Sequence, residues 1–408
     1  MARLVDHPAS GCSAHSRSTL RGAGSSGEDA AQAAVNRREF SAALAGAAAS
    51  AALAPSAQAA AAEAPAISQR AKTLYRHALI LDCNSSPPSQ ERLPLPQAAL
   101  ERVRDSGINV IKLTVGGINS DFADTVAEIA QVQQLCEVHP AYFTQVRIAA
   151  DFERARRERK LGIILSFESA EMLGGRLDSF ELFRNLGVRV MQLSYNRKSA
   201  FAAGVMEPGA GGLTSLGRDA VRRMNQLGIA VDLSHANPQT TADTLGLSAR
   251  PPIMTHAGCS AVHVHPRNKT DEQLRALAAR GGVVGIFDLP YLTASPRQPT
   301  LDDYMAHLEH ALQVAGEDHV GIGSDVGIDP FDTSPKGMAE FAHELEERRK
   351  AGLSAPEEDR PIYVLGLNTP RRIEIIADRL LQRGYSGAAT ERVLGANFAR
   401  VLAEIWAA

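Results

Sequence analysis

Four residues of the kinds that bind metals or move protons stand at or just after the ends of apolar, strand-like segments. They are Glu168, His235, His256 and Asp325. A carboxylate and two imidazoles that meet at one point form a donor set that suits zinc. Each residue also has an ordinary explanation, because a histidine after a strand is commonly a loop or core residue and Asp325 could cap a turn. The placement of all four at segment ends favours a shared site.

Further polar side chains follow the first and fourth of these segments. Asp82, Asn84 and Ser86 follow the first, and Tyr195 ends the fourth. Parallel strands bring their carboxyl ends to one face, where barrels of such strands carry their active sites. Asp82, Asn84, Ser86 and Tyr195 are therefore candidates for the same site.

The segments that must position these residues alternate with helical patterns from residue 60 onward. Most are apolar or β-branched throughout, as strands buried on both faces should be. The predicted strands are Ala78–Asn84, Ile108–Val115, Gly162–Glu168, Val188–Tyr195, Gly228–Ser234, Pro251–His256, Gly282–Phe287 and His319–Asp325. Apolar residues at three- and four-residue spacing predict helices over Thr214–Leu227, Thr270–Arg280, Thr300–Ala315 and Ser386–Trp406.

This repeated order of strand and helix predicts an α/β fold, a single (β/α)₈ barrel of TIM type over residues 60–408. An open doubly wound sheet is the alternative. The barrel is favoured because the polar residues at the strand ends come from many strands and not from one crevice. The charged segment 328–364 after the last strand is interpreted as an insertion that acts as a lid.

Composition and the N-terminal residues limit the partners and the location. The chain has 408 residues, a formal net charge of −3 and no long basic tract, so nothing indicates a nucleic-acid partner. Within residues 1–59, Arg37-Arg38 precede an Ala-rich apolar run that is too short for a membrane span. The order resembles a twin-arginine export signal and predicts a periplasmic or secreted protein, with a disordered leader as the alternative.

Several short motifs occur together between residues 186 and 401. They include Leu186-Gly187-Val188-Arg189, Asp232-Leu233-Ser234-His235, Pro266-Arg267-Asn268, Gly281-Gly282-Val283-Val284-Gly285 and Leu394-Gly395-Ala396-Asn397-Phe398. In this combination the chain resembles the membrane (renal) dipeptidase family, which consists of zinc peptidases on amidohydrolase-like barrels. The resemblance covers essentially Arg76 to Trp406.

The resemblance implies a role for each candidate. The family holds two zinc ions bridged by one glutamate, which would be Glu168, and His235 and His256 would bind the second ion. Arg267 resembles the arginine that grips the substrate's carboxylate through a bidentate fork, although a salt bridge to Asp271 or Asp288 is the alternative. Asp325 resembles the acid that holds the attacking water and passes its proton to the leaving amine.

The chain departs from the family pattern at two places. Asn84 and Ser86 stand where the family has the histidine and aspartate that bind the first zinc, and an amide and a hydroxyl are weak zinc ligands. We therefore expect one zinc ion in preference to two. Tyr195 stands where the family has a histidine that polarises the scissile carbonyl, and a phenol can still donate a hydrogen bond there.

The sequence thus predicts a metallohydrolase that cleaves a dipeptide or a related short amide with a free carboxylate by means of a zinc-activated water. The alternative is an impaired barrel that binds a small peptide-like ligand without hydrolysis, because fold analogy alone does not decide function. The resemblance also implies that the protein could form a homodimer.

Overall fold

A computed structural model describes residues 66–88, 93–117 and 120–407 of the chain. The leader predicted for residues 1–59 lies outside these residues. The strands are β1 (Leu81–Asp82), β2 (Val110–Thr114), β3 (Phe143–Gln145), β4 (Leu161–Phe167), β5 (Val188–Met191), β6 (Ala230–Val231), β7 (Met254–Cys259), β8 (Asn268–Lys269), β9 (Val284–Ile286) and β10 (Val320–Ile322).

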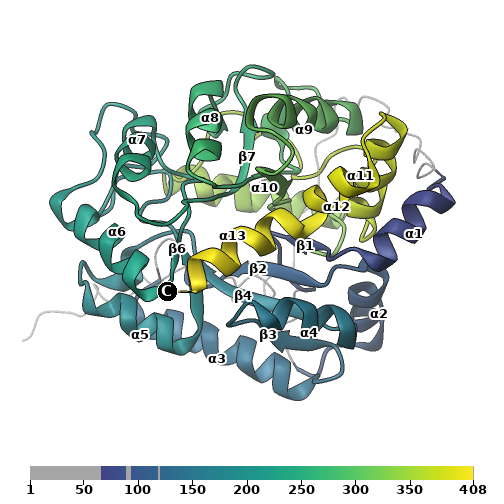
Figure 1. The fold of residues 1–408 in the computed structure, drawn as a ribbon, viewed down its shortest axis with the longest axis horizontal. Helices are drawn as coiled ribbons and strands as arrows, with labels where there is room; N and C mark the ends of the chain where they lie inside the picture. Colours follow the sequence, from purple (N-terminus) through teal and green to yellow (C-terminus); the bar gives the residue numbers. More distant parts are fainter. Residues whose placement is uncertain (1–65, 89–92, 118–119, 408) are drawn as a thin grey trace, which may run out of the picture. The chain divides into compact units, whose positions relative to one another are not determined.

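Helices lie around the strands, as Figure 1 shows. The α-helices are α1 (Gln69–His77), α2 (Gln97–Ser106), α3 (Phe122–Val138), α4 (Ala150–Glu158), α5 (Asp178–Leu186), α6 (Ser215–Leu227), α7 (Pro238–Leu247), α8 (Asp271–Ala279), α9 (Leu301–Ala315), α10 (Pro335–Lys350), α11 (Arg372–Gln382), α12 (Gly387–Glu391) and α13 (Asn397–Trp406). Short turns η1 (Glu171–Leu173) and η2 (Pro290–Leu292) and a π-helical segment η3 (Arg392–Ala396) complete the list.

The strands pair in parallel in the order β6-β5-β4-β2-β1-β10-β9-β7-β8, and β3 pairs with the start of β4. A parallel bridge between Asp232 and Ile253 joins the end of β6 to the residue before β7. Across it, the Ile253 amide donates to the Val231 carbonyl at 3.0 Å, and the Leu233 amide donates to the Ile253 carbonyl at 2.8 Å. Eight strands therefore follow one another in a ring, as the predicted (β/α)₈ barrel requires.

These eight strands are the predicted ones. Except for β4 and β7, each observed strand is shorter than the predicted segment. The lengths were overestimated because apolar residues, such as Ala78–Ile80 before β1, continue the run beyond the hydrogen-bonded ladder. Strands β3 and β8 were not predicted, since segments of two and three residues leave no periodic signal in the sequence.

The predicted helix starts are present with their caps. The Thr214 hydroxyl accepts from the Gly217 amide at the start of α6, and Thr270 and Thr300 each form a capping box at α8 and α9. The predicted helix Ser386–Trp406 is divided by the π-helical segment at Gly395. A Cβ at Gly395 would lie 2.4 Å from the Leu79 carbonyl oxygen, so only glycine lets the backbone pack this close to the start of β1.

The interior of the barrel is apolar at the amino ends of the strands. Leu81, Val110, Ile164 and Val190 pack there with Phe398 of α13. Toward the carboxyl ends the inward positions become polar, and Lys112 and Glu168 follow Val110 and Ile164 on the same faces. None of the helices that the structure describes combines the length and the apolar character needed to cross a bilayer.

Candidate metal centre

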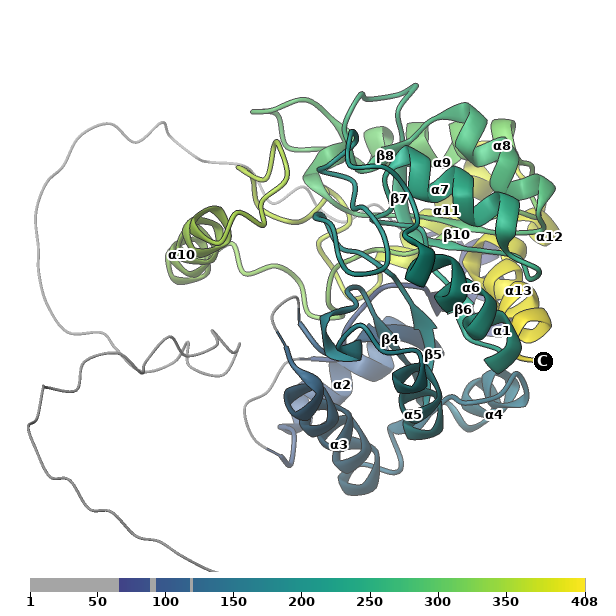
Figure 2. The ribbon, with the colours of Figure 1, turned by 90° about the vertical axis from the view of Figure 1, so that its left-hand side faces the viewer.

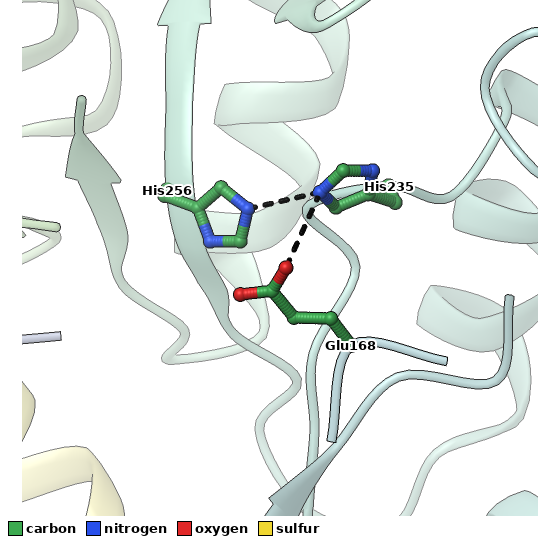
Figure 3. A group of neighbouring side chains, drawn as sticks. All are labelled: Glu168, His235 and His256. Atoms are coloured by element: carbon green, nitrogen blue, oxygen red, sulfur yellow. Dashed lines mark hydrogen bonds and ion pairs between the residues drawn. The ribbon is translucent and has the colours of Figure 1, made fainter. Parts of the chain in front are cut away.

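Three side chains from separate strands meet at the mouth of the barrel. Glu168 follows β4, His235 follows β6 and His256 lies in β7 (Figure 3). The two imidazole Nε2 atoms are 3.1 Å apart, and His235 Nε2 lies 4.0 Å from Glu168 Oε2. One ligand atom from each residue falls within 4.8 Å of the others. The structure thus brings together the three residues that the sequence predicted as zinc ligands.

The hydrogen bonds around His235 decide which of its nitrogens carries the proton. Its Nδ1 lies 2.9 Å from Asn196 Oδ1, and Asn196 Nδ2 donates to the Leu353 carbonyl at 2.9 Å. The asparagine atom that faces the ring is therefore the acceptor oxygen, so Nδ1 carries the proton. His235 Nε2 is left with a lone pair that points into the site.

A similar chain of contacts orients His256. Its Nδ1 lies 2.8 Å from Thr255 Oγ1, and that hydroxyl donates its own proton to Asp232 Oδ2 at 2.6 Å. Thr255 Oγ1 can then only accept from His256, so Nδ1 is again the protonated nitrogen. His256 Nε2 also presents a lone pair, and it faces that of His235.

Two facing lone pairs need a cation or a shared proton between them. Burial lowers the pKa of His256 to about 3 and the pKa of His235 well below its ordinary value, so a proton is a poor occupant. Zinc–nitrogen bonds of about 2.0–2.1 Å in a tetrahedral shell place two nitrogens about 3.3 Å apart. The observed 3.1 Å and the nearby carboxylate fit a zinc ion in size and in donor chemistry.

Asp325 also reaches this site. Its Oδ2 lies 3.9 Å from His256 Nε2, and its Oδ1 accepts from Asn84 Nδ2 at 2.6 Å. Burial, and then the neighbouring Glu168 carboxylate, raise the pKa of Asp325 to about 7. Its backbone has a φ of 60°, in the left-handed region that aspartate seldom adopts, and such strain often marks a functional position.

The two weak candidates for metal ligands make other contacts. Asn84 directs its amide nitrogen at Asp325, so that atom is a hydrogen-bond donor and not a ligand. The Ser86 carbonyl accepts from the Ile328 amide at 2.9 Å, and the Ser86 hydroxyl lies beside Gly327. The Asp82 side chain points away from the site. It accepts hydrogen bonds from the Ser324 hydroxyl and from Arg372 on the outer face of the strand. The reason is the strand register, in which Asp82 pairs with Ile111 and so shares its outward face.

Sequence reasoning missed Lys112, which lies in β2 and is fully buried. Its Nζ is 3.3 Å from Glu168 Oε1, and Thr114 Oγ1 donates to the same oxygen at 2.8 Å. Burial acts to raise the pKa of Glu168, but Lys112, His256 and hydrogen bonds from Thr114 and Asn84 outweigh it and hold the pKa below its usual range. The one available signal was a lysine at an inward position of an otherwise apolar strand.

Arg267 is buried with unpartnered donors. It is 3% exposed, and its Nε and Nη2 have no hydrogen-bond partner among the described residues. The alternative salt bridges predicted for it do not form, because Asp271 pairs with Arg275 and His310 and Asp288 lies 3.6 Å from Arg372. After burial, the Arg267 charge is the next cause of the lowered pKa of His235, and it opposes the rise in the pKa of Asp325, which places Arg267 close to the site. A buried, unpaired guanidinium fits an anionic ligand.

The Tyr195 ring lies against the imidazole of His235. The two rings stack with centroids 4.0 Å apart, and burial raises the pKa of the Tyr195 phenol. The charge of Arg348, in α10, opposes this rise. Burial lowers the pKa of Arg348 itself, but its interactions with Tyr195 and Glu358, which include a hydrogen bond to each, outweigh burial and raise it. The Arg348 guanidinium also binds Glu358 at 2.8 Å. Tyr195, the candidate for polarising the scissile carbonyl, is therefore held in place by a residue of the segment 328–364.

That segment makes several contacts with the loop after β5. Asn196 Nδ2 donates to the Leu353 carbonyl, and Arg197 Nε donates to the Gly352 carbonyl at 2.8 Å. Figure 2 shows α10 at the side of the molecule, apart from the helices that surround the barrel. The segment thus contacts site residues, and its action as a lid stays a prediction.

A family model described as membrane dipeptidase (peptidase family M19) matches residues 68–351. A dipeptidase from Claviceps purpurea is 29% identical over 290 residues, which make up 70% of this chain and 61% of that protein. A Klebsiella pneumoniae protein encoded in the pqqA 5′ region is 32% identical over 63% of this chain and 87% of its own length.

Solved structures agree with the sequence matches. An amidohydrolase from Pseudomonas aeruginosa is 28% identical, with a TM-score of 0.73 over 83% of this chain and 99% of its own. A Rhodobacter sphaeroides metallopeptidase, solved with a phosphinate mimic of the dipeptide L-Ala-D-Ala, has the same fold at 21% identity and a TM-score of 0.65, over 81% of this chain and 99% of its own. With a barrel whose mouth carries a glutamate and two histidines, this chain belongs to the membrane dipeptidase family, peptidase family M19.

Proposed function

We propose that the protein is a metal-dependent hydrolase that holds one zinc ion between Glu168, His235 and His256. Its substrate would be a dipeptide or a related short amide with a free carboxylate. The observation that carries the proposal is the pair of Nε2 lone pairs facing each other at 3.1 Å. When bound, zinc would supply Lewis-acid chemistry and an acidified water nucleophile. Membership of the M19 family supports this assignment.

The surrounding residues can bind and orient the substrate. Arg267 would pair its unpartnered Nε and Nη2 with the two oxygens of the substrate's C-terminal carboxylate. Tyr195 would donate its phenolic proton to the oxygen of the scissile carbonyl, since Arg348 can donate to the phenol oxygen and leave that proton free.

Asp325 would move the proton. Its Oδ1 is held by Asn84 at 2.6 Å, which leaves Oδ2 free on the side of His256. Oδ2 would accept a proton from the attacking water and return it to the nitrogen of the leaving amine as the amide bond breaks. Asn84 then acts as a positioning residue for Asp325 in place of a metal ligand.

The test is elemental analysis of the purified protein after zinc loading, together with hydrolysis of a Gly-D-Ala type dipeptide. We expect about one zinc per chain and measurable hydrolysis, both lost in His235→Ala because one of three protein ligands is removed. His310→Ala is the matched control, since that imidazole binds Asp271 at 2.7 Å outside the site. A protein that binds no zinc and cleaves no dipeptide would refute the proposal.

The second candidate is a barrel that binds a peptide-like ligand without cleaving it. Asn84 favours it, because an amide replaces the imidazole that the family places there. This candidate predicts that a dipeptide binds in an Arg267-dependent way, as measured by calorimetry, while the zinc-loaded protein shows no turnover.

A further inference from the structure

The two oxygens of Glu168 have different neighbours. Oε1 receives the Lys112 ammonium at 3.3 Å and the Thr114 hydroxyl at 2.8 Å. Oε2 lies 4.0 Å from His235 Nε2, on the side of the candidate zinc site. One oxygen is therefore already bound to a cation of the protein itself, and the other is available to an ion.

The fold holds Lys112 in this position. Lys112 lies two residues after Val110, which packs in the barrel interior, and it pairs in register with Ile164 of β4. Its side chain is fully buried, so the chain cannot turn the ammonium out to solvent without breaking the strand. A buried ammonium needs an anionic partner, and Glu168 is the only acidic group with which Lys112 forms an ion pair among the described residues.

Asn84 and Ser86, at the positions predicted for the ligands of the other ion, are poor ligands for a second metal ion. The Asn84 amide nitrogen donates to Asp325. The Ser86 hydroxyl is neutral and lies beside Gly327. A second divalent ion would have to share Glu168 Oε1 with the ammonium, and two cations at such short range repel strongly in a buried site.

We infer that Lys112 is a built-in cation that occupies the place of a second metal ion on Glu168 and so limits this centre to a single ion. The inference rests on the proposed function, because it takes Glu168, His235 and His256 as the ligands of the one ion. Lys112 then neutralises one half of the carboxylate permanently, and the exchangeable ion binds to the other half.

The experiment compares zinc stoichiometry, by elemental analysis and calorimetry, in three proteins that differ in these positions. The double variant Asn84→His with Ser86→Asp restores an imidazole and a carboxylate but keeps Lys112. The triple variant adds Lys112→Met, which removes the charge at similar side-chain length. We expect one zinc in the wild type, one in the double variant and two in the triple variant. Two ions in the double variant, or one in the triple variant, would overturn the role of Lys112.

The single variant Lys112→Met is a second test that does not require new ligands. Loss of the positive charge near the ion should lower the dissociation constant of zinc at the site of Glu168, His235 and His256 by at least about tenfold. If Lys112 served only to hold Glu168 in place, zinc would bind as before or more weakly, and the inference would fail. Circular dichroism with zinc present checks that each variant is folded.

The same data separate this inference from the proposed function. A wild type without zinc would remove the proposed function and the inference with it. A wild type with one zinc and a double variant with two would leave the proposed function intact and remove only the role of Lys112.

Discussion

On one side of the barrel mouth, His235 and His256 direct two lone pairs at each other, whereas on the other side Lys112, Thr114 and Asn84 direct donors at two carboxylates. We call the first pair the histidine side and the second group the lysine side. Glu168 lies between them, with Oε2 toward the histidine side and Oε1 toward the lysine side.

The difference shows that neighbouring polar residues can serve opposite purposes. The lysine side is complete, because every charge there has a partner within the protein. The histidine side is incomplete, because its two lone pairs face each other with no proton donor between them. Arg267 is incomplete as well, because its Nε and Nη2 have no hydrogen-bond partner among the described residues. Groups that stay unsatisfied when buried raise the free energy of the folded protein unless a ligand binds, so they point to function.

The largest expected effect contrasts the two sides directly. His256→Ala removes one ligand from the histidine side and should lose the bound zinc, with hydrolysis falling about 10³-fold, equivalent to ~4 kcal/mol. Asn84→Ala, on the lysine side, should retain the zinc and lose only turnover, because it releases Asp325. Zinc content by elemental analysis decides between them. Loss of zinc from Asn84→Ala would show that the two sides are not distinct.

The next effect concerns a buried ion pair that lies beside the lysine side. The Arg372 guanidinium is 2% exposed and binds Asp82 at 3.1 Å, the Ser324 hydroxyl and the Gly327 carbonyl. Arg372→Met leaves Asp82 buried and unpaired, so the free energy of unfolding should fall by about 3 kcal/mol. Urea unfolding measures this loss. An unchanged urea midpoint would mean that the ion pair adds nothing to stability.

Arg267→Lys tests the role of the two unpartnered guanidinium nitrogens while it keeps the positive charge. The ammonium cannot form the bidentate fork, so kcat/KM for a dipeptide with a free carboxylate should fall about 10²-fold, mainly through KM. The same dipeptide with an amidated C-terminus is the control, and both proteins should hydrolyse it equally poorly. Equal losses on both substrates would place Arg267 outside the carboxylate pocket.

The smallest effect uses His265 as a histidine with both nitrogens satisfied. Nε2 donates to the Pro356 carbonyl at 2.8 Å, and Nδ1 accepts from the Arg267 amide at 3.1 Å. Burial lowers the pKa of His265 to about 4, so the unfolded chain binds a proton that the folded chain excludes at pH values between this pKa and the ordinary one. Its contribution to stability is complete above the ordinary pKa of about 6.5 and is lost as the pH falls toward the folded-state value.

Urea unfolding near neutral pH and at mildly acidic pH checks this prediction. One proton allows a slope of at most about 1.4 kcal/mol per pH unit. His265→Gln keeps a donor for Pro356 but does not titrate, so its unfolding free energy should depend less steeply on pH than that of the wild type. Parallel pH profiles for the two proteins would contradict the assigned shift.

Much of the fold could be predicted because its signals are local. Apolar runs such as Gly162–Glu168 predict buried strands, and Thr270 before α8 predicts a capped helix. The convergence of Glu168, His235 and His256 could be predicted for the same reason, since each stands at a strand end that the barrel brings to one face. Residue type and position along the chain are enough for predictions of this kind.

What the sequence by itself determined is therefore the order of strands and helices, the face on which the site lies and the three residues that meet there. The tertiary structure decided that Asp82 faces outward, that Lys112 binds Glu168 and that both histidines present Nε2 to the site. These facts depend on the register between strands and on partners such as Asn196 and Thr255, which become neighbours only when the barrel closes.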